Sequence, residues 1–117
     1  MYNQERCIIF PRSNEAAALV ESNVKGSRFE IEQIDLSYDQ YAKLKLFGFF
    51  DYPKETGVKI LSNSFVKIET RDIPVLIDSA LISRKEIGDR CLLKVIDRFV
   101  EKCTRSVVQN LPIWFST

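Results

Sequence analysis

Four carboxylates near the middle of this 117-residue chain could converge to do acid–base or cation chemistry. Asp35 and Asp39 flank an expected helix start, while Asp51 and Glu55 lie in the loop after that helix. Converging carboxylates can bind a divalent cation, or two of them can act as acid and base. The segment lacks the alternating oxygen ligands and the glycine of a calcium-binding loop. Helix capping and ion pairing are therefore the preferred interpretation of these side chains.

The chain contains no histidine, which excludes every mechanism that needs an imidazole as base, metal ligand or phosphoryl carrier. A zinc site built from cysteine alone needs four thiolates with paired spacing. Only three cysteines are present, Cys7, Cys91 and Cys103, and none are paired in this way. The four glycines form neither a Walker loop nor a dinucleotide fingerprint. These absences argue against an enzyme, and we expect no metal and no cofactor.

The segment 46–53 carries four aromatic residues within six positions, next to acidic residues. Loops usually lie on the surface, and aromatic rings rimmed by acids make good anchors for a protein partner. We expect Phe49 and Tyr52 to be such anchors, with Asp51 and Glu55 facing basic groups of the partner. The alternative is that these rings cover the sheet, with Phe49 making the apolar contact of a helix-ending motif.

A row of basic residues follows the clearest helical pattern in the chain. The row consists of Arg90, Lys94, Arg98 and Lys102. Cations at this spacing can contact phosphates, which makes the row a candidate nucleic-acid surface. Acidic residues share the exposed face, and the pairs Glu86–Arg90 and Arg98–Glu101 have the spacing of helical ion pairs. We favour a solvated, ion-paired face, so nucleic-acid binding is the alternative to protein binding.

Composition is that of one ordinary globular domain over residues 1–117, with 45% apolar and 28% charged residues. The net charge of +1 indicates neither nucleic acid nor anionic membrane as a partner. The first residues lack the apolar core of a signal peptide, and no apolar run reaches the length of a membrane span. We expect a cytoplasmic protein whose three cysteines are reduced and buried as small hydrophobes.

Two strands and a helix are expected in the first third of the chain. A short apolar strand over 7–10 ends at Pro11, and Ser13 begins a helix that reaches Asn23. Alternation over 28–35 predicts a half-exposed strand with Phe29 and Ile31 on its apolar face and Glu32 in solvent. Ile34 and Leu36 shift the apolar phase near the end of this strand.

The next segment combines a helix signal with a strand-like alternation. Ser37 and Gln40 form a capping box for a helix over 38–47, and Gly48 is a natural stop. Apolar residues alternate with lysines inside this segment, as they would in a strand. The cap and the glycine favour the helix.

The second half begins with an expected hairpin. Strands over 58–61 and 65–70 are joined by the turn residues 62–64. We take residues 75–77 as a further strand, although Asp72 and Pro74 before them also suit the start of a helix.

A long amphipathic helix is expected at the carboxyl end, from a capping box at Ser83 and Glu86 to about Asn110, before Pro112. Its apolar face comprises Ile87, Cys91, Leu92, Val95, Ile96, Phe99, Val100, Cys103 and Val107. Residues 113–115 then form a last strand or dock on a partner.

Together these elements predict an α+β fold: a small mixed or antiparallel sheet with helices packed largely on one face. The function expected is that of a non-enzymatic protein-binding module. A small cytosolic inhibitor or a toxin-neutralising, immunity-type protein suits the size and the missing cofactor motifs. Its partner would be a toxin or an enzyme with a basic surface.

Overall fold

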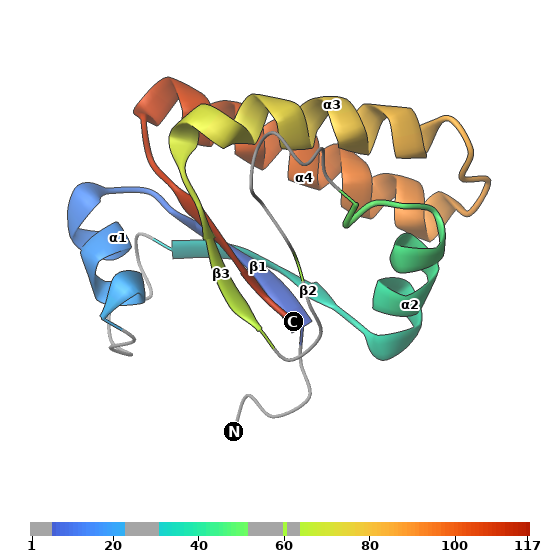
Figure 1. Ribbon diagram of the computed structural model, residues 1–117, viewed down its shortest axis with the longest axis horizontal. Helices are drawn as coiled ribbons and strands as arrows, with labels where there is room; N and C mark the ends of the chain where they lie inside the picture. Colours follow the sequence, from blue (N-terminus) through green and yellow to red (C-terminus); the bar gives the residue numbers. More distant parts are fainter. Residues whose placement is uncertain (1–5, 23–30, 52–59, 61–63) are drawn as a thin grey trace.

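The computed structural model describes residues 6–22, 31–51, 60 and 64–117. They form an antiparallel sheet of four strands in the order β2-β1-β4-β3, together with four helices (Figure 1). The strands are β1 (Arg6–Pro11), β2 (Ile31–Leu36), β3 (Phe65–Ile68) and β4 (Ile113–Ser116). The helices are α1 (Asn14–Glu21), α2 (Tyr38–Leu46), α3 (Ile73–Arg84) and α4 (Arg90–Gln109), with a 3₁₀ turn at Thr70–Asp72.

The last strand lies in the middle of the sheet. Ile8 of β1 is opposite Ile34 on one side and Phe115 of β4 on the other, and all three side chains are fully buried. On its other edge β4 pairs with β3, so that Ile113 is opposite Ile68. Of the alternatives left open for residues 113–115, the strand is the one that forms, and the apolar tail belongs to the core.

Helices α3 and α4 lie together over one face of the sheet (Figure 1). The inner face of α4 consists of Leu92, Val95, Ile96, Phe99, Cys103 and Ser106. Helix α2 adds Tyr41 and Leu44 to the same core, whereas α1 lies at the opposite face, where Glu21 pairs with Lys67. The predicted α+β class, with helices largely on one face and a long amphipathic last helix, is confirmed.

Local capping chemistry defines two helix starts as expected. The Ser13 hydroxyl accepts the amide hydrogen of Ala16 at the start of α1. Before α2, Ser37 accepts from the Gln40 amide while the Gln40 side chain accepts from the Ser37 amide. This reciprocal capping box satisfies two otherwise unpaired amides. It explains why the alternating lysines of 38–46 adopt a helix rather than a strand.

The segment after the 3₁₀ turn is a helix, so the prediction of a strand at 75–77 is wrong. Pro74 lies in the first turn of α3, where a missing amide hydrogen costs nothing. The buried positions Ile73, Leu76 and Ala80 follow a helical period rather than an alternation. Periodicity over three residues was too short to distinguish the two structures.

The capping box predicted at Ser83 is also wrong. Ser83 is buried in the last turn of α3, and α4 begins instead behind Asp89. The Asp89 carboxylate accepts the amide hydrogens of Cys91 at 2.8 Å and Leu92 at 3.3 Å. The predicted helix therefore starts later than expected: Ser83 and Arg84 end α3, and α4 begins at Arg90.

Strand β2 faces the core with Ile34 and Leu36, the residues at which the predicted apolar phase shifts, and this face includes Glu32. Ile34 and Leu36 are buried, and Glu32 lies on the same face because side chains two apart in a strand point the same way. The prediction that the Glu32 side chain faces solvent is therefore wrong. Part of the predicted strand, residues 28–30, lies outside the described residues. So do the hairpin turn over 62–64 and nearly all of the strand over 58–61.

No disulfide joins the three cysteines, and they differ in exposure. Cys103 is fully buried, and burial raises the pKa of its thiol. Cys91 is exposed at the start of α4, so its predicted burial is wrong: the inner face of the helix begins one residue later, at Leu92. Within the described part of the chain, no helix is long and apolar enough to cross a bilayer.

Candidate functional site

The aromatic segment after α2 divides into a buried part and an exposed part. The amide of Phe49 donates to the Leu44 carbonyl (3.0 Å), and that of Gly48 donates to Lys45 (3.1 Å). Gly48 has a φ of +77°, so these bonds make a Schellman ending in which the residue after the glycine turns inward. Phe49 is that residue and is fully buried.

Phe49 belongs to the aromatic core, so its prediction as a partner anchor is wrong. Its ring centroid lies 5.0 Å from that of Phe99 and 5.0 Å from that of Phe50, both edge-on. The alternative interpretation, an apolar contact that closes the helix, is the correct one. Tyr52 and Glu55, the other predicted anchor and one of the predicted acidic contacts, lie outside the described residues.

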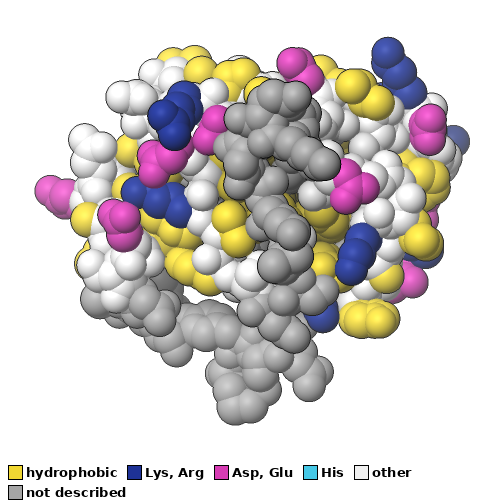
Figure 2. Space-filling model, in the orientation of Figure 1, with side chains coloured by type: hydrophobic (Ala, Val, Ile, Leu, Met, Phe, Trp, Pro, Cys, Tyr) yellow, Lys and Arg dark blue, Asp and Glu magenta, His cyan; other side chains and the backbone are white. Residues whose placement is uncertain are grey.

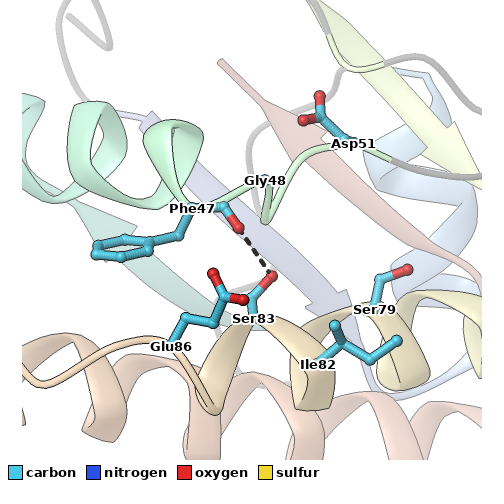
Figure 3. Close-up of a pocket in the computed structure, with 7 residues that line it drawn as sticks. All are labelled: Phe47, Gly48, Asp51, Ser79, Ile82, Ser83 and Glu86. Carbon is cyan, nitrogen blue, oxygen red and sulfur yellow. Dashed lines mark hydrogen bonds between the residues drawn. The ribbon is translucent and has the colours of Figure 1, made fainter.

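The exposed part of this segment borders a pocket. Phe47 is 38% exposed, and across the pocket Ile82 of α3 is 65% exposed. The open space between the two walls is about 370 Å³. It is lined by Phe47, Gly48, Asp51, Ser79, Ile82, Ser83 and Glu86 (Figure 3). We call these lining residues the α2–α3 surface.

Polar groups in this pocket come from both walls. The Ser83 hydroxyl donates to the Phe47 carbonyl at 3.3 Å, which ties the end of α3 to the end of α2 (Figure 3). Asp51 was the acidic contact predicted from the sequence, and it is exposed at the rim. Glu86 adds a second carboxylate from the turn after α3. Neither carboxylate forms an ion pair with another described residue.

Sequence reasoning missed the α3 side of the pocket. The wrong predictions of a strand at 75–77 and of a helix start at Ser83 placed these residues in other structures. The missed residues are Ser79, Ile82, Ser83 and Glu86. A helical period over 73–84 would have indicated them. Ile82 lies off the buried stripe of that helix, and an apolar residue there has to face solvent.

Asp35 and Asp39 do not converge with Asp51. Asp39 pairs with Lys43 at 3.1 Å and raises the pKa of that lysine, while Asp35 accepts a hydrogen bond from Gln33 at 2.7 Å. The described residues contain no group of three acidic, cysteine or histidine side chains able to hold a metal ion. Ion pairing is thus what the structure assigns to Asp39.

The basic row on α4 is divided between two environments. Arg90, Lys94 and Arg98 are exposed, whereas Lys102 turns toward Glu32 of β2 and keeps only 15% of its side chain exposed. The predicted pairs Glu86–Arg90 and Arg98–Glu101 do not form. Glu86 precedes α4 and does not share its surface.

Asp97 of α4 forms an ion pair with Arg84 of α3 rather than with a basic residue of its own helix. Its carboxylate accepts two hydrogen bonds from Arg84, at 2.7 and 3.2 Å, and this contact lowers the pKa of Asp97. Arg90, Lys94 and Arg98 have no ion pair within the described residues. On the face seen in Figure 2, Lys and Arg side chains are interspersed with Asp and Glu, without a large area of one sign.

Glu32 is the centre of a partly buried charge cluster. Its carboxylate accepts a hydrogen bond from Lys102 at 2.5 Å and one from Arg12 at 2.7 Å, and a guanidinium nitrogen of Arg105 lies 3.4 Å away. The bond from Lys102, followed by that from Arg12, holds the pKa of Glu32 at about 2, although partial desolvation opposes this. Arg12, only 10% exposed, also donates to Ser106 at 3.3 Å. This cluster fastens β1 and β2 to α4.

No protein-family model, curated protein or solved structure matches this chain. The geometry of the molecule therefore has to carry the functional argument. Its described residues offer a pocket with exposed apolar side chains and with acids that have no ion-pair partner among them, a set of exposed cations on α4, and the Glu32 cluster, whose acid is already paired.

Proposed function

We propose that this protein is a non-enzymatic protein-binding module that covers a partner through the α2–α3 surface. One observation carries the proposal: exposed Phe47 and Ile82 line a pocket together with Asp51 and Glu86, which lack ion-pair partners among the described residues. Apolar anchors with a charged rim are the usual composition of a specific protein interface. The acidic rim favours a partner with a basic surface.

The scaffold around this surface supports recognition rather than turnover. The Ser83 hydroxyl holds the Phe47 carbonyl by a hydrogen bond, and Phe49 is buried in the core. Because the backbone of this segment is held in place, its exposed side chains lose little conformational entropy on binding. A small inhibitor or toxin-neutralising, immunity-type protein would use such a rigid patch. The absence of a disulfide among the three cysteines supports a reducing location such as the cytoplasm.

Affinity measurements on matched variants test this function. Ile82→Ala removes an exposed β-branched side chain from the α2–α3 surface, and Val108→Ala removes one from the far end of α4, where Val108 is 81% exposed. We expect binding of a partner captured from cell extract to fall about tenfold for Ile82→Ala and to stay unchanged for Val108→Ala. Equal affinities for the two variants and the wild type would exclude the surface.

A second candidate function is nucleic-acid binding by Arg90, Lys94 and Arg98, because these cations are exposed and not neutralised within the described residues. Each phosphate contact would contribute a slope of about −0.7 to −0.9 to the dependence of log affinity on log salt. The triple variant with glutamine at these positions should then lose the salt dependence. A flat salt response of the wild type on a mixed oligonucleotide pool would remove this candidate.

A further inference from the structure

The outer side of α3 carries large apolar residues that the fold leaves uncovered. This helix lies along the upper border of the view in Figure 1, with the sheet below it. Its buried residues are Ile73, Leu76, Ala80 and Ser83. Away from this buried side, Leu81 is 44% exposed and Ile82 is 65% exposed. A helix with apolar residues around most of its circumference is normally covered on more than one side.

Four residues form a single row along this outer side. Positions 74, 78, 81 and 85 follow one another at steps of three or four, so their side chains lie one above another on the helix surface. We call them the outer row of α3; it consists of Pro74, Asp78, Leu81 and Lys85, all exposed. Ile82 lies beside this row, on the side of the pocket.

The two charged residues of the outer row have no ion-pair partner among the described residues. Asp78 lies in the middle of α3, and Lys85 is the residue that caps its carboxyl end. The neighbouring Arg84, by contrast, pairs with Asp97 of α4. The outer row therefore presents an exposed leucine between one acid and one base that the described part of the chain leaves without a counter-ion.

The spacing of these charges makes the row complementary to itself. Asp78 and Lys85 are seven positions apart, about 10 Å along the helix at ~1.5 Å per residue, and the midpoint between them falls between Leu81 and Ile82. A two-fold axis through this midpoint sets a second copy of α3 antiparallel to the first. It brings Asp78 of each copy beside Lys85 of the other. A parallel arrangement in the same register would instead place like charges together.

We propose that this chain forms a two-fold symmetric dimer through the outer row of α3. Leu81 and Ile82 of the two copies form its apolar centre, and an Asp78–Lys85 ion pair on each side sets the register. Only one helix of each copy takes part, so the buried area is small and the dimer is weak. This inference goes beyond the proposed function and does not depend on it. Because Ile82 borders both surfaces, the dimer competes with a partner bound at the α2–α3 surface.

Sedimentation equilibrium of the full chain tests the dimer without any partner. Between about 10 µM and about 1 mM we expect a monomer–dimer equilibrium with a dissociation constant of about 100 µM. We expect no larger species, because an isologous contact closes at two copies. Asp78→Lys should weaken the dimer about tenfold, since each dimer then contains two like-charge contacts. The charge-exchanged double variant Asp78→Lys/Lys85→Asp should restore the wild-type affinity, and circular dichroism checks that each variant is folded.

Matched variants locate the contact. Leu81→Ala should weaken the dimer, whereas Val108→Ala on α4 and Phe47→Ala on the opposite wall of the pocket should leave it unchanged. A wild type that stays monomeric at the highest concentration would refute the dimer, and if partner binding still depended on Ile82 the proposed function would survive. Failure of the charge exchange to rescue, or equal weakening by Leu81→Ala and a control, would refute the assignment to the outer row.

Discussion

Replacing Glu32 with glutamine should destabilise the protein because three cations share that carboxylate. Glu32→Gln keeps the size of the side chain and removes the charge that meets Arg12, Lys102 and Arg105. Arg12 is the critical partner, since only 10% of its side chain is exposed and water cannot replace the lost acceptor fully.

The size of the effect follows from the pKa of Glu32. The carboxyl falls from its ordinary value of 4.5 to about 2 in the folded protein. Since one pKa unit corresponds to about 1.4 kcal/mol, this fall corresponds to at most about 3 kcal/mol of stabilisation. About a third of the side chain is exposed, and solvent screening reduces the expected loss to about 2 kcal/mol.

The pH dependence gives this prediction its sign. Because the folded pKa of Glu32 lies below the unfolded one, its contribution is fully present above about pH 4.5 and disappears as the pH falls toward 2. The difference in unfolding free energy between wild type and Glu32→Gln should therefore be largest at neutral pH and shrink through that window. Taking the difference cancels the other carboxyls that titrate in acid.

Urea unfolding followed by the fluorescence of Trp114 measures this difference. Trp114 is the one tryptophan of the chain and is 2% exposed in the fold. Asp97→Asn is the matched control, because it also removes a carboxylate that binds an arginine, but in an exposed pair. A loss for Glu32→Gln that equals the control, or one that persists unchanged at low pH, would refute the reasoning.

Three further outcomes follow from burial and backbone geometry. Phe49→Ala should cost about 3–5 kcal/mol of unfolding free energy, whereas Phe47→Ala should be nearly neutral, as urea unfolding will measure; equal costs would contradict the division of the aromatic segment. Gly48→Ala should cost about 1 kcal/mol or more, because its φ of +77° strains any side chain; an unchanged unfolding midpoint would argue against that ending of α2. A thiol reagent should label exposed Cys91 rapidly and buried Cys103 only as fast as the protein opens; equal rates would contradict the burial of Cys103.

Sequence patterns were sufficient where a local signal determined the structure. Three such signals act within one helical turn: the capping residues Ser13 and Ser37, and the glycine at 48. Their effect can therefore be predicted without knowledge of the fold. The apolar stripe of α4 was equally clear, because it repeats over five turns of helix.

Patterns failed where distant contacts decided the outcome. The alternating pattern predicts that Glu32 faces solvent. In the fold, Arg12, which follows β1, and Lys102 of α4 pair with Glu32 and stabilise it on the inner face of the strand. The sequence predicts that the ring of Phe49 is exposed in a loop, whereas the Schellman turn directs it toward Phe99. The pocket itself depends on where α3 ends, and Gly88 alone did not reveal that break.

Amide hydrogen exchange of the protein with and without a captured partner tests the central claim most directly. Covering of the α2–α3 surface predicts slower exchange over 44–51 and 79–86 on binding, with no change at the carboxyl end of α4 over 104–110. Protection that instead follows the outer face of α4, around Arg90, Lys94 and Arg98, while 79–86 exchanges as in the free protein, would contradict the claim.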